Sequence, residues 1–394
     1  MGDGGGVIST DFLQDGGNID GSFEIDGEFG WADGSWSTTN PSATTVIKSD
    51  GVLYIEDTTS FYENRDITNY GTVNWTGGTL LTNANGSFVN FGSFNDQSDS
   101  DHNLSETSGD STFTNDGTYL KTGAGTTRID QTFDNGSPVT LDVRNGVLEL
   151  NGGGTNGSSG AVVVKNDGLI RFTDNYTIEN AANLSTESLS GDYGYELESG
   201  ELELNGQLNV DFLQTGGELE GSQTINATYT LEGGDWDANS DGATTTISST
   251  GVVNIDPLGE QDPDFDNRDI VNDGTFNWHH GDLDTTAAGS FTNNGTFNDL
   301  TDDDNDIGET GGDATFTNNG TFTKSNESET RISQDFDQYG TLEVDAGRLS
   351  LADDANFGAT SDTQIGTGAI LSVAGDVTAL ADGAVIAGVR DRHF

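Results

Sequence analysis

The chain has 394 residues, of which 67 are Asp or Glu and only 13 are Lys or Arg, so its formal net charge is −54 at pH 7. This charge excludes a basic surface for nucleic acid and disfavours anionic membranes. Cys is absent, which excludes disulfides and thiolate metal sites. No apolar run approaches the roughly 20 residues of a membrane-spanning helix, and residues 1–6 lack the basic and apolar parts of a signal peptide.

The sequence is a tandem duplication. Residues 11–17, Asp-Phe-Leu-Gln-Asp-Gly-Gly, return as residues 211–217, Asp-Phe-Leu-Gln-Thr-Gly-Gly. Arg65-Asp-Ile67 likewise returns as Arg268-Asp-Ile270. Such self-similarity is typical of stacked architectures.

Three parts follow from the duplication. We predict an N-terminal lead over 1–10, a first unit over 11–210 and a second unit over 211–394. The second unit stops earlier than the first, which indicates truncation, whereas the Ala- and Gly-rich segment 364–389 suggests a cap or an association surface.

A finer repeat runs inside each unit. An apolar residue, a spacer, Asn, a spacer, Gly, a hydroxyl residue and an apolar residue recur with Asn at positions 69, 90, 115, 272, 293 and 318. Asn and Gly both tolerate positive φ, and the Asn side chain can bond its own backbone, so we expect a turn at each Asn-x-Gly. The Asn spacings of 21 and 25 residues are the same in both units.

Strands are expected on both sides of these turns. Apolar and polar residues alternate after the glycines, in 51–55, 146–150, 200–204, 251–255 and 347–351. Because this alternation has a period of two residues, one face of each strand should point inward.

The fold prediction is an all-β, parallel β-solenoid with rungs of about 20–25 residues, built from two copies of a roughly 200-residue unit. Stacked rungs would place Val73, Phe94 and Tyr119 over one another and join equivalent Asn side chains in a hydrogen-bonded ladder. A β-sandwich or an up-and-down barrel is the alternative, but neither requires the same turn chemistry in each unit.

The rungs resemble those of β-helical surface proteins such as autotransporter passengers and filamentous adhesins. Residues 71–80, 291–297 and 340–344 carry this resemblance, which is one of repeat style rather than of a diagnostic motif. It implies an exported or exposed β-helix and no particular ligand. Pectate-lyase-like enzymes are less similar, because the chain has no matching catalytic cluster.

The acidic composition is typical of an extreme halophile's protein. At molar salt the Debye length is roughly 3 Å, so repulsion between exposed carboxylates is largely screened. Intrinsic disorder is the alternative, since high net charge and low hydropathy are its signature. The 20 Phe, five Trp and regular apolar alternation favour a folded chain.

A calcium site is predicted in the loop after the second turn of each unit. Oxygen ligands at alternating positions suit Ca²⁺, which takes six to eight of them. The candidate ligands are Asp299, Asp302, Asp304, Asp306 and Glu309, matched in the first unit by Asp96, Asp99, Asp101, Asn103 and Glu106. A solvated acidic loop is the alternative, and the stretch 262–266 is a weaker metal candidate.

Enzyme motifs are missing from the sequence. His279 and His280 have no counterpart in the first unit, and the many carboxylate pairs arise by chance in so acidic a chain. We therefore expect no catalytic residues and no cofactor other than Ca²⁺. The five Trp could stack on sugar rings, but alternation favours a core position for Trp75 and Trp278.

Asn-x-Ser/Thr sequons are frequent, which makes N-glycosylation possible. They begin at Asn74, Asn85, Asn103, Asn135, Asn156, Asn175, Asn183, Asn226, Asn294, Asn319 and Asn326. A chain rich in Asn, Ser, Thr and Gly also generates such sequons by chance.

The functional hypothesis is a non-enzymatic structural or adhesive module, namely a stalk, adhesin or fibre segment on a halophile cell or a virion. Its expected partners are neighbouring copies of itself or surface glycans and proteins. The alternatives are a self-assembling extracellular filament subunit and a polysaccharide-active β-helix enzyme.

Overall fold

The computed structural model describes residues 5–37, 43–56, 59–82, 86–237, 242–257, 262–286, 289–311 and 314–388. In these ranges the regular elements are β-strands and one short 3-10 turn, η1 (Ala181–Asn183), and the strands pair in parallel. The parallel β-solenoid predicted from the repeat is confirmed. The chain forms two compact units, residues 1–202 and 203–394.

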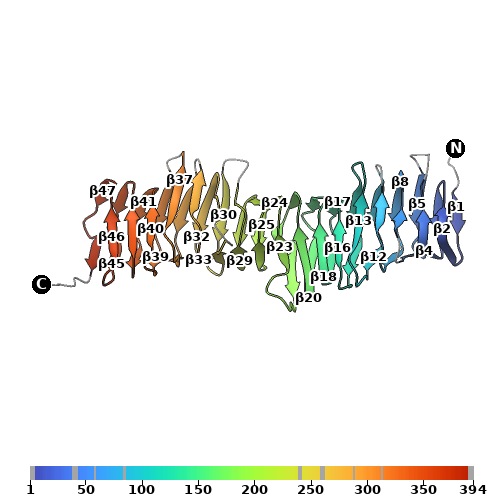
Figure 1. Ribbon diagram of the computed structural model, residues 1–394, viewed down its shortest axis with the longest axis horizontal. Helices are drawn as coiled ribbons and strands as arrows, with labels where there is room; N and C mark the ends of the chain where they lie inside the picture. Colours follow the sequence, from blue (N-terminus) through green and yellow to red (C-terminus); the bar gives the residue numbers. More distant parts are fainter. Residues whose placement is uncertain are drawn as a thin grey trace. The chain divides into compact units, whose positions relative to one another are not determined.

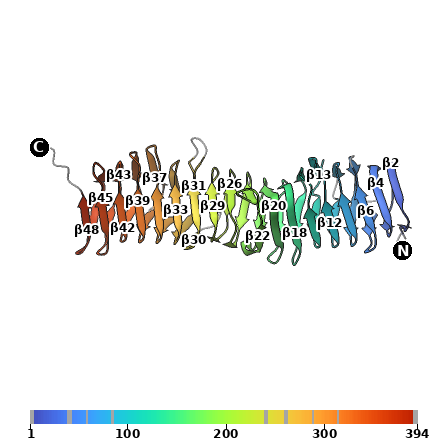
Figure 2. The same ribbon diagram turned by 90° about the horizontal axis from the view of Figure 1, so that it is seen from below.

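The first unit stacks its strands in three columns (Figure 1). The first column contains β1 (Gly6–Ile8), β3 (Phe23–Ile25), β5 (Ala43–Ile47), β8 (Arg65–Asn69), β11 (Ser87–Asn90), β14 (Thr112–Asn115), β17 (Thr132–Asn135), β19 (Gly154–Asn156) and β21 (Tyr176–Ile178). The second, most of whose strands are labelled in Figure 2, contains β2 (Phe12–Asn18), β4 (Glu28–Ser35), β6 (Val52–Ile55), β9 (Thr72–Trp75), β12 (Ser93–Asp96), β15 (Thr118–Lys121), β18 (Thr140–Leu150), β20 (Ala161–Phe172) and β22 (Leu184–Glu187). The third contains β7 (Ser60–Phe61), β10 (Leu80–Thr82), β13 (His102–Glu106) and β16 (Thr126–Ile129), continues through the second halves of β18 and β20, and reaches β23 (Tyr195–Leu197).

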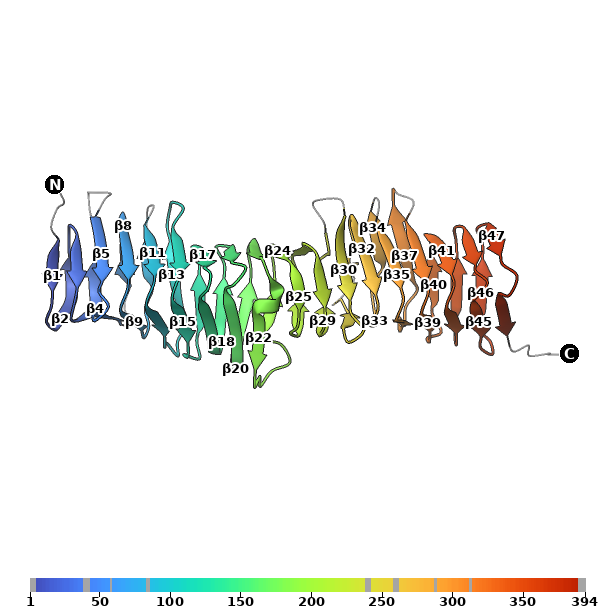
Figure 3. The ribbon, with the colours of Figure 1, turned by 180° about the vertical axis from the view of Figure 1, so that it is seen from behind.

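The second unit repeats the three columns (Figure 3). The first contains β25 (Gly206–Leu208), β28 (Gln223–Ile225), β30 (Ala243–Ile247), β32 (Arg268–Asn272), β35 (Ser290–Asn293), β38 (Thr315–Asn318), β41 (Asp335–Gln338), β44 (Ala355–Phe357) and β47 (Val377–Leu380). The second contains β26 (Phe212–Gln214), β29 (Thr228–Leu231), β31 (Val252–Ile255), β33 (Thr275–Trp278), β36 (Thr296–Asp299), β39 (Thr321–Lys324), β42 (Thr341–Val344), β45 (Asp362–Ile365) and β48 (Val385–Gly388). The third contains β34 (Leu283–Thr286), β37 (Asn305–Thr310), β40 (Glu329–Ile332), β43 (Arg348–Leu351) and β46 (Ile370–Val373). Two further strands are β24 (Glu201–Leu204) and β27 (Glu218–Glu220).

Aromatic rings fill the core of each unit in register from coil to coil. Phe94 pairs with Val73 in the coil before it and with Tyr119 in the coil after it, as the repeat predicts. Because inward side chains repeat at every coil, like rings stack on like rings; the Phe94 and Tyr119 centroids are 5.2 Å apart. All three residues are fully buried.

The predicted asparagine ladder is present in both units. In the first, each Nδ2 donates to the Oδ1 of the next coil at 2.7–2.8 Å, through Asn69, Asn90, Asn115, Asn135 and Asn156. In the second, Asn272, Asn293 and Asn318 continue to Gln338 at 2.8 Å per step. The sequence pattern predicted only the first three rungs of each ladder.

The glycines of the turn motif have a different role from the one predicted. Gly71, Gly92 and Gly117 do not adopt the positive φ expected of them. Instead, each lies against the coil before it, and a Cβ on Gly92 would lie 2.2 Å from the carbonyl oxygen of Gly71. Only glycine allows this close approach. The Asn side chain does bond its own turn, since Asn69 Oδ1 accepts from the N–H of Gly71 at 3.0 Å.

Candidate functional site

The first predicted calcium loop directs its side chains to several places. Asp96 ends β12 and is fully buried in the core. Asp99 and Asp101 are exposed, and each accepts a hydrogen bond from a backbone N–H of the next coil, at 3.1 and 2.8 Å. Asn103 is half-buried in β13, and Glu106 Oε2 accepts a backbone N–H at 2.8 Å.

The second loop repeats this arrangement. Asp299 ends β36 and is fully buried. Asp304 accepts a backbone N–H of the next coil at 2.7 Å, and Glu309 accepts one within its own loop, also at 2.7 Å. Asp306 pairs with an arginine of the next coil at 3.2 Å, and Asp302 is exposed.

These carboxylates are therefore dispersed. Among the residues that the structure describes, no three of them bring ligand atoms within 4.8 Å of one another. The backbone hydrogen bonds of Asp99, Asp101 and Asp304 join one coil to the next, as expected of a solvated acidic loop. Calcium binding by these loops stays a prediction.

A different set of carboxylates converges in the second unit. Asp262 Oδ1 accepts the N–H of Asp282 at 2.9 Å, and Asp282 Oδ1 accepts the N–H of Asp306 at 2.7 Å. Asp264 bridges to Asp284 in parallel register. Burial, followed by repulsion from neighbouring aspartates, raises the pKa of Asp264 to about 6, and burial also raises the pKa of Asp282 and Asp284. At neutral pH these aspartates therefore repel one another in the folded unit.

Lowering the pH from 7 to 5 is expected to stabilise the second unit. Folded Asp264 takes up its proton near pH 6, whereas the unfolded chain does so only near pH 3.8, so protonation favours the folded state in this window. We expect the unfolding temperature at molar salt to rise by about 2 °C more in the wild type than in Asp264→Asn. The exposed control Asp302→Asn should behave as the wild type. Equal rises in all three proteins, measured by circular dichroism, would contradict the assignment.

A charged pair lies inside the first unit where the pattern calls for apolar side chains. Lys121 and Asp96 are directly paired across β12 and β15, both are 0% exposed, and Nζ lies 3.6 Å from Oδ2. Lys121 Nζ donates to Thr127 Oγ1 at 2.8 Å, and the Tyr119 hydroxyl donates to Asp96 Oδ2 at 3.1 Å. His102 Nε2 lies 3.0 Å from the other carboxylate oxygen, Oδ1.

The protonation of this cluster follows from its contacts. His102 Nδ1 lies 2.8 Å from a backbone carbonyl, which only accepts, so Nδ1 carries a hydrogen. Burial lowers the pKa of Lys121, and Asp96 opposes that shift. Burial would raise the pKa of Asp96, but the hydrogen bond from His102 and the charge of Lys121 outweigh it and hold that pKa low.

The second unit contains the same pair without the histidine. Lys324 and Asp299 are paired across β36 and β39, both are 0% exposed, and Nζ lies 3.7 Å from Oδ2. The Thr301 hydroxyl donates to Asp299 Oδ1 at 2.8 Å, and the Thr330 hydroxyl donates to Oδ2. Lys324 Nζ donates to Ser328 Oγ at 3.2 Å.

Sequence reasoning missed both pairs although the signal was present. In 93–96 and 118–121 the inward positions are the second and the fourth, which places Asp96 and Lys121 on the core side of their strands. The calcium prediction instead places Asp96 in a surface loop, as its first ligand. The alternation of the strand is the stronger signal.

The tryptophans and the paired histidines have the positions expected for structural residues. All five Trp are fully buried, which confirms the core position of Trp75 and Trp278 and leaves no Trp ring open to a sugar. His279 is half-buried. The His280 side chain is 45% exposed and lies 3.5 Å from Asp302.

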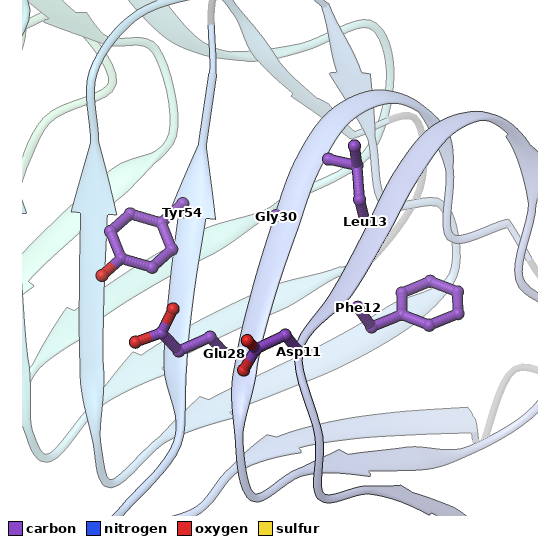
Figure 4. A pocket seen from close by; sticks show the side chains of 6 residues that line it. All are labelled: Asp11, Phe12, Leu13, Glu28, Gly30 and Tyr54. Carbon is purple, nitrogen blue, oxygen red and sulfur yellow. The ribbon is translucent and has the colours of Figure 1, made fainter.

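Two aromatic features reach the surface of the first unit. Tyr70 and Phe91 occupy the spacer of successive Asn-x-Gly turns, are about half exposed, and stack with centroids 5.2 Å apart. A shallow open hollow lies beside Phe12 and is also lined by Asp11, Leu13, Glu28, Gly30 and Tyr54 (Figure 4). Its two carboxylates and its openness distinguish it from an enclosed ligand cavity.

The sequons differ in accessibility. Asn135 and Asn156 are buried in the ladder, so a glycan cannot be attached to either in the folded unit. Eight are exposed or half-exposed, namely Asn74, Asn103, Asn175, Asn183, Asn226, Asn294, Asn319 and Asn326. The remaining sequon, at Asn85, lies outside the described residues.

No protein family model, no curated protein and no solved structure matches this chain. Within the described residues, no helix has the length and apolar character needed to span a membrane.

Proposed function

We propose that this chain is a non-enzymatic structural or adhesive module, a stalk, adhesin or fibre segment exposed on the surface of a halophile cell or a virion. The observation that carries the proposal is the unbroken side-chain ladder in each unit, from Asn69 to Asn156 and from Asn272 to Gln338. The ladders bind each coil that they span to the next one, which suits a part that carries load or sets a spacing.

The acidic surface supports the part of the proposal that places the protein in a high-salt environment. Asp99, Asp101 and Asp304 use one carboxylate oxygen to cap the next coil and keep the rest in solvent. With a net charge of −54, the folded state is favoured where salt screens this repulsion. We expect the strand signal in circular dichroism to persist at molar KCl and to weaken at millimolar KCl. An unstructured spectrum at molar salt would contradict the proposal.

The adhesive part of the proposal rests on Tyr70 and Phe91. An exposed pair of stacked rings offers an apolar face of the kind on which sugar rings pack. The second unit has Asp273 and Asn294 at the matching positions, so the chain supplies its own control. Binding to surface glycans at molar salt should be lost in Tyr70→Asp/Phe91→Asn.

A filament subunit is the second candidate. Strands β47 and β48 expose Val377, Leu380, Val385 and Ile386, an apolar face that a further coil would cover. Another copy of this chain could provide that coil.

Electron microscopy in molar salt, with and without chelator, separates the candidates. Isolated particles that release no reducing ends from acidic or neutral glycans would support the stalk or adhesin. Long polymers would support the filament, and loss of polymers on chelation would give the predicted calcium loops a role. Release of reducing ends would replace both proposals with a polysaccharide-active enzyme.

A further inference from the structure

Half of the lysines in this protein are inside it. The chain has four Lys, and Lys121 and Lys324 are both fully buried. Lysine is almost never fully buried unless it is paired, because the ammonium loses its hydration and the side chain loses its rotamer freedom. Both units nevertheless keep a buried lysine at the equivalent position, opposite an aspartate.

Neither lysine forms a normal charge-assisted hydrogen bond with its aspartate. The Nζ–Oδ2 distances of 3.6 and 3.7 Å exceed the 2.7–2.9 Å typical of such bonds. Each amine instead donates to a hydroxyl, of Thr127 in the first unit and of Ser328 in the second. The nitrogen therefore lies beside the carboxyl group without a hydrogen bond of normal length to it.

Buried apolar side chains flank each pair along its column of strands. In register, Trp75 lies on the Asp96 side of the first pair, and Val143 lies on the Lys121 side. The second pair lies between Trp278 and Val344 in the same order. All four of these side chains are 0% exposed. Such an environment makes two separate buried charges costly, and an uncharged amide product would remove that cost.

We propose that each pair is joined by an intramolecular amide bond, between Lys121 Nζ and Asp96 Cγ in the first unit and between Lys324 Nζ and Asp299 Cγ in the second. This is a modification site of the chain itself and needs no external oxidant or cofactor. It does not depend on the function proposed above.

The reaction is a condensation whose atoms balance. The ammonium first passes one proton to the carboxylate, which leaves a neutral amine and a neutral acid. The nitrogen lone pair then forms the Nζ–Cγ bond, one Cγ–O bond breaks, and that oxygen leaves as water with the proton it gained and a second one from Nζ. The product is a secondary amide, and the polar groups that remain are neutral.

The neighbouring side chains supply the proton transfers. In the first unit, His102 Nε2 lies 3.0 Å from Oδ1 and can donate to the departing oxygen. The lowered pKa of Lys121, caused by burial, makes its amine available as a nucleophile. In the second unit, the Thr301 hydroxyl donates to Asp299 Oδ1, which polarises the carboxyl group without titrating.

Mass spectrometry of the denatured full-length chain tests the proposal. Each bond lowers the intact mass by one water molecule, and proteolysis should yield a branched fragment that contains both strands of the pair. Each pair is judged by its own fragment: a branched fragment supports its bond, and separate unmodified peptides overturn it. A water lost within a single unbranched peptide, as in an aspartimide, counts against the bond.

Variants identify the partners. Lys121→Met should remove the first branched fragment and leave the second, whereas the surface control Lys165→Met should remove neither. Asp96→Asn should still give the amide but release ammonia in place of water. Asp96→Leu/Lys121→Met replaces both charged groups and keeps the proposal testable where a single variant leaves a buried unpaired charge and fails to fold. In His102→Gln the first bond should form more slowly after synthesis of the chain than in the wild type, with no change in the second.

Discussion

Replacing Phe316 with alanine is expected to lower the free energy of unfolding by about 3–5 kcal/mol, the usual cost of emptying a buried aromatic site. Phe316 is fully buried and stacks on Phe291 and Phe336, with centroids 4.8 and 5.7 Å away. It also meets Phe297 and Phe322 edge to face. The cavity would interrupt the column on both sides at once, and little can move in to fill it because the strands above and below are fixed by the ladder.

Denaturant titration at constant molar salt, followed by circular dichroism, measures this loss. The matched control is Phe91→Ala, which also removes a stacked phenylalanine ring but from a site that is 46% exposed. We expect the control to lose less than about 1 kcal/mol. Similar losses in the two variants would mean that the inner column contributes no more than a surface stack.

Such columns are the part of the structure that the sequence predicts best. A repeat of one turn motif at spacings of 21 and 25 residues leaves few ways to arrange the chain, because equivalent positions must lie over one another. The period-two alternation then decides which side chain points inward. Phe94 and Tyr119 satisfy both signals, and their positions were predicted correctly.

The polar interior is the part that sequence reasoning predicted least well. Asp96 occupies an inward position of its strand, but it also begins an acidic run, whose composition is typical of a surface loop. His102 has no repeat partner to mark it, since Asn305 occupies the equivalent position. Asp96, Lys121 and His102 come together because successive coils pair in register. The sequence alone does not show which loop residues point into the core.

The glycine turns show the same difficulty in the backbone. The requirement for glycine at position 92 arises from the carbonyl group of Gly71 in the coil before it, 21 residues earlier. The sequence around a turn can explain a glycine only through its backbone dihedral angles, and the φ of Gly92 is not one that requires glycine. The repeat identified the right residue, and the packing of coils supplied the reason.

Arg65 and Arg268, the duplicated arginines, are also buried, and neither has a carboxylate partner among the described ion pairs. Arg268 donates to the carbonyl oxygens of Leu219, Gly221 and Asp237 at 2.8, 2.9 and 2.6 Å. Burial lowers the pKa of both guanidinium groups to about 10, which shows how strongly the interior opposes their charge. The arginine is kept because its planar fork reaches several carbonyl groups from different coils at once.

Replacing Arg268 with methionine is therefore expected to lower the free energy of unfolding by about 3–5 kcal/mol, since it leaves one buried and two partly buried carbonyl oxygens without this donor. Arg268→Lys keeps the positive charge but not the planar guanidinium group, and its free energy of unfolding should fall by a similar amount. The control Arg331→Met breaks only an exposed pair with Asp306 and should lose about 1 kcal/mol or less. If Arg268→Met unfolds at the wild-type denaturant concentration, apolar packing can replace the fork, and the buried charge serves no purpose in stability.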